Sequence, residues 1–354
     1  MEGTTGAPRP TKVAYRYVRA VEGWTSSPIG NAARNEEVED EEGTTGSNPD
    51  IFDEISTFVP DDTGVLAAPL CEQANVDEQT DTWAERWETE KAYQHPTFNL
   101  DLDMFIGLAA ELIPIAAMTF PGDTGLGHDN FSPRAVSRLS PAAINALAEL
   151  FIAFEKFGEW ADALDLVLIV LLPKNDGGYR PIGLFPTIIR IWFRTRLLTI
   201  KIWDQSNKMP SVFGGPGMGA QKAAFQISIT AEIAALENAD FAAGLLDLVK
   251  AFETVPHHIL VSIAIALGYP LPLLRLCLAS YRLKRSIGIE GVYSKTVVAT
   301  RGITAGSGTA ATELKLLLLP LMRMLEEQWA NSLVAKVYVD DLTLLVRGGQ
   351  ADGG

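Results

Sequence analysis

The chain has 354 residues, of which 47% are hydrophobic, and a formal net charge of −15. This length and composition suffice for one large domain or two smaller ones. Two cysteines exclude a disulfide framework and a zinc cluster. No basic segment followed by an apolar one opens the chain, and the longest apolar runs, 166–173 and 316–321, are too short to span a bilayer. We therefore expect an intracellular protein of nucleus or cytoplasm, not secreted and without a transmembrane segment.

The negative charge is concentrated at one end of the chain. Residues 1–117 carry 23 Asp and Glu against 7 Lys and Arg, a net charge of −16. Residues 118–354 carry 21 against 22, a net charge of +1. Charge in this larger part therefore neither requires nor excludes nucleic acid as a partner.

Residues 1–95 read as a disordered acidic leader. They contain the run Glu36–Glu42, repeated Gly-Thr-Thr-Gly and no sustained hydrophobic period. A short helix around 83–93 is the only element expected there. A solvated linker explains the composition more simply than a tail that binds a partner.

From residue 96 onward the pattern predicts an α/β (α+β) domain. Helical spacing of apolar residues predicts helices at 105–117, 141–157, 187–202, 223–237, 259–267, 271–281 and 312–329, the last interrupted by Pro320. Ser140 followed by Pro141 predicts the N-cap of the second helix. Strands are predicted at 166–172, 242–247, 288–290 and 296–300.

A turn signal, Asn-Asp-Gly-Gly, follows the first strand and lies between Lys174 and Arg180. These two cations are expected to flank the tip of a hairpin and could grip a triphosphate, the arginine in bidentate fashion. A solvated turn is the alternative interpretation.

Two stretches rich in small residues are predicted to be loops. The stretch 213–222 matches neither the spacing of a P-loop nor that of a dinucleotide-binding fingerprint. The stretch 301–310 would let a flat ligand or a nucleic-acid backbone approach closely.

Asp247 ends an apolar strand that we expect to be buried. A carboxylate at the carboxyl end of such a strand occupies a frequent position of catalytic acids in α/β sheets. His257 and His258, ten residues further on, are expected to begin the next helix and pack, rather than to act as ligands or bases.

The stretch 337–346 places Asp340 and Asp341 between two runs of β-branched and aliphatic residues. A hairpin with both acids near its tip would bring them to one site, where each raises the pKa of the other unless a cation neutralises them. Such a pair suits Mg²⁺, although an ordinary Asp-rich turn remains an alternative.

The order of these pieces is more specific than any one of them. It runs Lys-x-x-Gly-Gly-x-Arg-Pro-Ile, Leu-Asp-Leu-x-Lys-Ala-Phe, Gly-Ile-x-x-Gly-Ser and Tyr-Val-Asp-Asp, with Asp340 93 positions after Asp247. This order resembles the reverse transcriptase domain, most closely that of non-LTR (LINE-type) retrotransposons, over roughly residues 120–348.

The resemblance implies an RNA-directed DNA polymerase, a nucleotidyltransferase that uses an RNA template, a DNA primer and deoxynucleoside triphosphates. Its implied metal ligands are Asp247, Asp340 and Asp341, with the carbonyl of Leu248, for two Mg²⁺ ions that Mn²⁺ could replace. The implied nucleotide-binding residues are Lys174 and Arg180 as a triphosphate clamp, Phe252 as the gate against a 2′-hydroxyl, and Gly306 beneath the nascent base pair.

The resemblance also implies the architecture. We expect right-hand polymerase fingers and a partial palm, with an antiparallel sheet backed by helices and no thumb. The predicted division is 1–95 leader, 96–348 fingers and palm, and 349–354 tail.

Ala305 stands where the family usually has Gln, which removes a side chain expected to position template or nucleotide. Fidelity and rate are therefore in question. The expected lack of a thumb and the acidic leader favour an alternative function, that of a truncated, inactive retroelement remnant that at most binds nucleic acid or a partner. An RNA-dependent RNA polymerase, the third hypothesis, is disfavoured by Phe252 and the Tyr-Val-Asp-Asp form.

Overall fold

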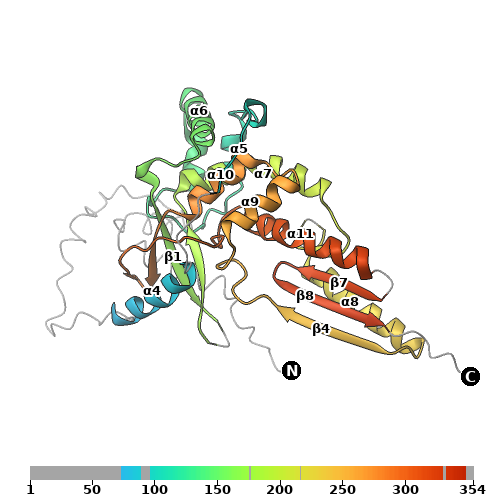
Figure 1. Ribbon diagram of the computed structural model, residues 1–354. Coiled ribbons are helices and arrows are strands. Elements are labelled where there is room, and N and C mark those ends of the chain that lie inside the picture. Colours follow the sequence, from blue (N-terminus) through green and yellow to red (C-terminus); the bar gives the residue numbers. More distant parts are fainter. Residues whose placement is uncertain (1–72, 89–95, 175–176, 216, 330–331, 348–354) are drawn as a thin grey trace, which may run out of the picture.

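The computed structural model describes residues 73–88, 96–174, 177–215, 217–329 and 332–347 (Figure 1). In chain order the elements are α4 (Gln73–Trp87), η1 (Leu102–Met104), α5 (Leu112–Met118), η2 (Pro133–Arg138), α6 (Pro141–Phe157), η3 (Asp162–Leu164), β1 (Leu166–Pro173), β2 (Tyr179–Leu184), α7 (Thr187–Ser206), β3 (Val212–Phe213), α8 (Ala220–Leu236), β4 (Phe241–Asp247), α9 (His257–Ala266), α10 (Leu271–Tyr281), β5 (Lys284–Ile289), β6 (Val292–Tyr293), α11 (Ala310–Trp329), β7 (Leu333–Tyr338) and β8 (Asp341–Arg347).

The strands form two four-stranded sheets, ordered β2-β1-β5-β6 and β3-β7-β8-β4. The α/β class is confirmed, but the expected antiparallel sheet is wrong in detail. Both sheets are mixed, because β1 pairs with β5 in parallel and β3 pairs with β7 in parallel. In each case the parallel neighbour comes from a distant part of the chain, which hydrophobic spacing alone does not reveal.

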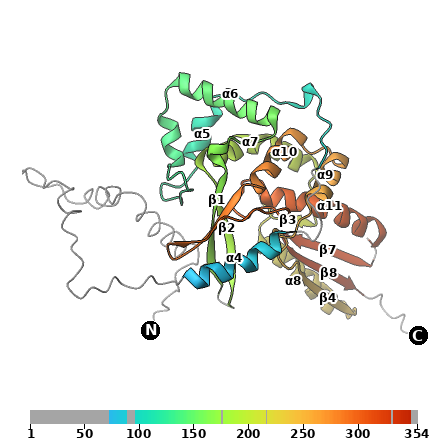
Figure 2. The same ribbon diagram turned by 60° about the vertical axis from the view of Figure 1, so that its left-hand side comes forward.

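Helices surround the two sheets on different sides (Figures 1 and 2). Helices α5, α6, α7 and α10 gather at one end of the first sheet, while α11 and α8 pack against β7 of the second. One continuous hydrophobic core runs from the Trp side chains of α4 through α7 and α10 to α11 and β7. No helix in the described ranges has both the length and the apolarity to cross a membrane.

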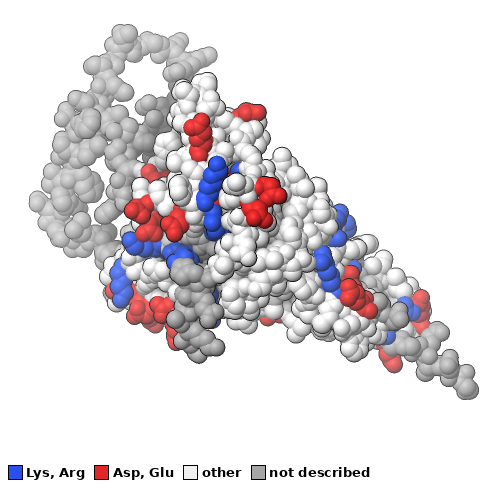
Figure 3. All heavy atoms as spheres, turned by 45° about the horizontal axis from the view of Figure 1, so that its top comes forward, with Lys and Arg blue, Asp and Glu red and all other residues white. Residues whose placement is uncertain are grey.

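Acidic and basic side chains alternate in small groups over the face shown in Figure 3, with wide uncharged areas between them. This distribution agrees with the near-neutral balance of residues 118–354.

Helix α4 lies inside the segment expected to be a disordered leader, so that expectation is wrong for residues 73–87; the helix overlaps the short helix expected around 83–93 but begins ten residues earlier. Trp83 and Trp87 are 1% and 2% exposed, and the helix packs on β5 and β6 (Figure 2). The guanidinium carbon of Arg285 lies 4.5 Å from the centroid of the Trp87 ring. Two buried indoles stabilise this helix despite its polar composition. Residues 1–72 and 89–95 of the expected leader lie outside the described residues, so its domain boundary stays a prediction.

Other predicted elements agree with the structure to different degrees. The α6 prediction is confirmed, and Ser140 Oγ accepts a hydrogen bond from the Ala143 N–H at 3.3 Å. The helix predicted at 105–117 is confined to α5. The strand predicted at 296–300 is reduced to an isolated bridge between Val297 and Arg285. Pro320 lies within α11 without interrupting it.

Strand β4 begins one residue before the predicted strand and ends at Asp247 as predicted, but it lacks the predicted burial. It is the edge strand next to β8, and Leu245 and Leu246 are 76% and 49% exposed. Helix α8 contacts this region but leaves an apolar stripe exposed at Phe225, Ile229 and Ile233. The apolar sequence predicts a strand, but whether the strand is buried depends on which other elements cover it in space.

A buried ion pair joins α7 to α6. Arg196 donates from Nε and Nη2 to the two carboxylate oxygens of Glu155, both at 2.6 Å. The same guanidinium donates to the carbonyls of Ile106 and Gly107. Arg196 is 1% exposed, so this arginine of α7 lies in the core rather than in solvent. A bidentate pair whose remaining donors are also bonded tolerates such burial.

His257 begins α9 and packs, as predicted. Its Nε2 lies 2.8 Å from the carbonyl oxygen of Gly302, so the side chain fastens the loop after residue 301 to the helix. Burial lowers the pKa of His257 from 6.5 to about 4. The imidazole is therefore neutral in the folded chain at pH 7.

We expect Arg196→Met to lower the free energy of unfolding by about 3–5 kcal/mol, because it leaves the Glu155 carboxylate buried without its cation. Urea unfolding followed by circular dichroism measures the change. Arg194→Met is the matched control, since Arg194 is an exposed residue of the same helix, and its cost should stay below about 1 kcal/mol. Equal costs for the two variants would contradict the structural role of the buried pair.

His257 also predicts a pH dependence of stability. Between pH 6.5 and about 4 the unfolded chain takes up a proton at this residue that the folded chain does not. The folded state therefore loses stability as the pH falls through this range, by about 2 kcal/mol between pH 7 and pH 5.

His257→Gln should reduce the loss of stability on going from pH 7 to pH 5 by that amount, whereas His258→Gln at the exposed neighbour should retain it. Urea unfolding at the two pH values measures the difference. An unchanged pH dependence in His257→Gln would show that the imidazole is not held neutral.

Candidate active site

The hairpin of β7 and β8 has Val339 and Asp340 at its tip. Tyr338 pairs with Asp341, so the turn between the strands contains only these two residues. The predicted hairpin is thus confirmed. Val339 has φ +59°, a left-handed conformation that is unfavourable for a β-branched residue. Strain of this kind is tolerated where the surrounding structure imposes it, and it is concentrated at functional sites.

The antiparallel register of β4 and β8 brings the acidic residues together. Asp247 is the direct partner of Asp341, and the N–H of Leu248 donates to the carbonyl of Asp340 at 3.2 Å. Directly paired residues have Cβ atoms about 4.5–5.5 Å apart and side chains on one face. Two carboxylates in this position repel each other, which favours a cation between them.

The pKa of Asp340 reflects this crowding. Burial raises it above its ordinary value, and the charges of Asp341 and Asp247 raise it further. Hydrogen bonding to the backbone and the charge of Arg180 act in the opposite direction. The charges of three acids and of Arg180, in the β1–β2 hairpin, therefore influence one another at this end of the sheet.

These acids fit Mg²⁺ in ligand type but do not form a finished metal site. Their carboxylates are hard oxygen donors, as Mg²⁺ prefers. In the part of the chain that the structure describes, however, no group of three or more His, Cys, Asp or Glu side chains is close enough to hold an ion. The Leu248 carbonyl accepts the N–H of Ala251 at 3.2 Å and retains a second lone pair for a further partner.

The expected cations flank the tip of the β1–β2 hairpin. Pro173 pairs with Tyr179 and Leu172 with Arg180, and the N–H of Lys174 donates to the carbonyl of Gly178 at 3.0 Å. The hairpin prediction is confirmed. The Asn-Asp part of the turn signal, 175–176, lies outside the described residues.

Lys250 is a cation that the sequence analysis did not single out. It has φ +53°, and its ammonium lies 4.7 Å from the centroid of the Trp83 ring. Burial lowers its pKa, Glu253 raises it, and Lys174 and Arg180 are among the cations that lower it. Lys250 thus lies near α4, near the two cations of the β1–β2 hairpin and near the strand that ends at Asp247. Its place three residues after Asp247 was the signal available in the sequence.

The loop of small residues at 302–308 contacts both the β1–β2 hairpin and the turn after β4. The N–H of Gly183 in β2 donates to the carbonyl of Ala305 at 2.6 Å, and the N–H of Ile303 donates to the carbonyl of Phe252 at 2.7 Å. Gly306 has φ +107°, and a Cβ there would lie 2.3 Å from the Gly183 carbonyl oxygen. Only glycine permits this approach. Phe252 is half-buried against the core.

A buried polar network lies behind this loop and was not anticipated. Tyr281 donates from its hydroxyl to Glu313 at 2.5 Å, and its oxygen lies 2.9 Å from Ser307 Oγ and 3.2 Å from Thr309 Oγ1. Burial raises the pKa of Glu313. The network ties the loop to α10 and α11. Glu313 in the mostly apolar first half of α11 was the sequence signal for it.

No curated protein matches this chain. Among solved structures, it is similar to apo telomerase from Candida tropicalis truncated from the C-terminal domain, with 12% identity and a TM-score of 0.39. That match covers 58% of this chain and 49% of the telomerase chain. The family model for reverse transcriptase (RNA-dependent DNA polymerase) matches residues 172–352, half of the sequence, and the chain therefore belongs to the reverse transcriptase family.

Proposed function

We propose that the chain is an RNA-directed DNA polymerase domain of the non-LTR retrotransposon type, which adds deoxynucleotides to a primer 3′-hydroxyl. One observation carries the proposal: Asp247 is paired with Asp341 at the end of the sheet where Asp340 forms the turn. Membership of the reverse transcriptase family supports the same chemistry. The fingers-and-palm architecture and the retrotransposon subtype are part of this proposal.

The carboxylates of Asp247, Asp340 and Asp341 would hold two Mg²⁺ ions, or Mn²⁺ as a substitute, with the Leu248 carbonyl as a further ligand. Two such ions lower the pKa of an attacking hydroxyl and stabilise charge on a triphosphate and its leaving group. In the free protein these acids repel one another, which makes the site receptive to cations.

Lys174 and Arg180 would bind the triphosphate. The charge of Arg180 already acts on Asp340, and both cations act on Lys250. Fixed cations beside the acidic residues would offset the negative charge that develops on the transferred phosphoryl group.

Phe252 would select deoxynucleotides, and Gly306 would lie beneath the nascent base pair. The carbonyl of Phe252 accepts the N–H of Ile303, so the proposed gate is anchored to the same loop as Gly306. Because the backbone of Phe252 is fixed by this hydrogen bond, its ring can exclude the 2′-hydroxyl of a ribonucleotide by size.

The alternative is a catalytically inactive retroelement remnant that binds nucleic acid or a partner. Ala305 in place of the family's Gln favours it, because a side chain expected to position template or nucleotide is missing.

Primer extension distinguishes the two functions. With Mg²⁺, an RNA template, a DNA primer and deoxynucleotides, the full chain should extend the primer, and Asp340→Ala should reduce the rate at least about 100-fold by removing charge stabilisation. Asp165→Ala is the control, since Asp165 pairs with Lys284 on the surface. Extension that is absent, or equal in Asp340→Ala, would favour the remnant.

Sugar selection tests the gate. We expect Phe252→Ala to raise the ratio of ribonucleotide to deoxynucleotide incorporation by about 10-fold or more, because a hydroxyl then meets no steric barrier. Phe157→Ala serves as the control, because Phe157 is 78% exposed on α6. The same ratio in both variants would remove Phe252 from this role.

A further inference from the structure

Helix α4 reaches the candidate active site from outside the segment that the family model matches. The match begins at residue 172, whereas α4 ends at Trp87. The buried face of α4 consists of Val76, Thr80, Trp83 and Trp87, and the helix packs on β5 and β6. The contacts that α4 makes with the site therefore cannot be read from the family match.

The C-terminal end of α4 is bonded to the residues that precede the loop of small residues. The carbonyl of Trp87 accepts the N–H groups of Thr300 and Arg301, at 2.9 and 3.2 Å. The last carbonyls of a helix have no partner within the helix, so these two residues cap α4. The next residue, Gly302, begins the loop and donates its N–H to the carbonyl of Val255, in the turn after β4. Helix α4 is thereby fixed relative to that turn.

Trp83 lies against a lysine of the same turn. The ammonium of Lys250, three positions after Asp247, is 4.7 Å from the centroid of the Trp83 ring, within the range of a cation–π contact. Trp83 is 1% exposed, so packing fixes its ring, whereas Lys250 is only half-buried. Because a lysine side chain is long and flexible, the fixed ring determines where its ammonium lies.

Lys250 is one of several cations that lie near the acids. Burial lowers the pKa of Lys250, and the charge of Glu253 raises it. Three further cations lower it: Arg86, Lys174 and Arg180. Arg180 also acts on the acidic residues at the β7–β8 hairpin. Like charges gathered in this way repel one another, and an anion bound among them would relieve the repulsion.

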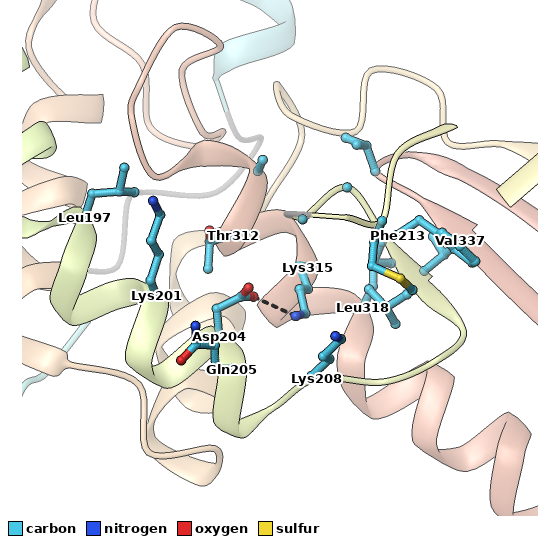
Figure 4. A pocket seen from close by; sticks show the side chains of 16 residues that line it. Leu197, Lys201, Asp204, Gln205, Lys208, Phe213, Thr312, Lys315, Leu318 and Val337 are labelled. Atoms are coloured by element: carbon cyan, nitrogen blue, oxygen red, sulfur yellow. Dashed lines mark hydrogen bonds and ion pairs between the residues drawn. The ribbon is translucent and has the colours of Figure 1, made fainter. Parts of the chain in front are cut away.

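Lys250 has no carboxylate partner in the described part of the chain, because none of the ion pairs there includes it. The pocket between α7 and α11 shows the opposite case. There the ammonium of Lys315 lies 2.6 Å from Asp204 Oδ1, as the dashed line in Figure 4 marks. A cation neutralised in this way attracts a further anion weakly, whereas the charge of Lys250 is available to a ligand.

A polyphosphate is the anion that suits these cations. Its oxygens carry several negative charges along a short chain, so more than one cation can bind it at once. Lys174 and Arg180 are contributed by the β1–β2 hairpin, and Lys250 is contributed by the turn after β4. Cations from two separate elements would fix a triphosphate more firmly than cations from the hairpin alone.

We propose that Lys250 binds the triphosphate of the incoming deoxynucleotide together with Lys174 and Arg180, and that Trp83 is the positioning residue that holds Lys250 for this contact. The inference rests on the proposed function, which supplies the ligand. It adds a substrate-binding residue to the site and makes α4 part of the nucleotide site.

The first test measures anion binding separately from polymerisation. Magnesium tripolyphosphate is titrated into the full chain in a calorimeter, without template or primer. Lys250→Met keeps the aliphatic stem and removes the charge, and it should weaken binding about 10-fold or more, because one charge-assisted contact is lost. Lys250→Arg should retain most of the affinity. The control Lys156→Met removes an exposed lysine of α6 and should change the affinity less than about twofold.

The second test separates positioning from the stability of α4. Trp83→Leu keeps a large apolar side chain but removes the aromatic face, and it should weaken tripolyphosphate binding about 5-fold. Trp83→Phe, which keeps a ring, should recover most of the affinity. In a chain that already carries Lys250→Met, Trp83→Leu should have no further effect. The matched control is Trp87→Leu, because Trp87 is 2% exposed on the same helix and contacts Arg285. This variant should change the affinity less than about twofold.

Thermal melting checks that Trp83→Leu and Trp87→Leu are folded to the same extent. Unchanged binding in Lys250→Met, equal effects of the two tryptophan variants, or a full chain without affinity for tripolyphosphate would overturn the inference. In primer extension, Lys250→Met should raise the KM for deoxynucleotide about 10-fold. An active polymerase whose KM is unchanged in that variant refutes the role of Lys250 alone. A chain that binds tripolyphosphate through Lys250 but extends no primer refutes the polymerase proposal and leaves the anion site in place.

Discussion

The arrangement of the site depends on how closely backbone can approach backbone at residues 302–308. Gly302 and Gly306 both have positive φ, and a Cβ at either would lie within 2.5 Å of a carbonyl oxygen, that of Glu253 or that of Gly183. The loop can therefore lie against the hairpin strand β2 and the turn after β4 at once. These contacts fix the position of the β1–β2 hairpin, which carries Lys174 and Arg180, relative to the strand that ends at Asp247. The buried network of Tyr281 and Glu313 supports the loop from behind.

Electrostatic repulsion acts within that frame. Asp247 and Asp341 are cross-strand partners, a pairing that destabilises a sheet when both side chains are charged. Val339 adds backbone strain at the adjoining turn. Neither feature stabilises the free fold, so the packing of β7 against α11 and the core must offset both. Repulsion and strain of this kind are concentrated at functional sites.

Local features were predictable from sequence because they depend on neighbouring residues. The Ser140 cap, both hairpins and the end of β4 at Asp247 follow from turn chemistry and hydrophobic spacing. Features set by distant residues were missed. The exposure of β4 depends on which elements cover it, and the burial of Arg196 depends on Glu155, 41 positions away. The strand β3 has only two residues, and it is defined by its parallel pairing with β7, which is distant in the sequence.

The convergence of the three acids was predictable only in part. Spacing could not predict it, because Asp340 lies 93 positions after Asp247, yet the order of the motifs implied it through the family resemblance. The structure supplies the physical link: β8 carries Asp341 at its first position and β4 carries Asp247 at its last, so antiparallel pairing must align them.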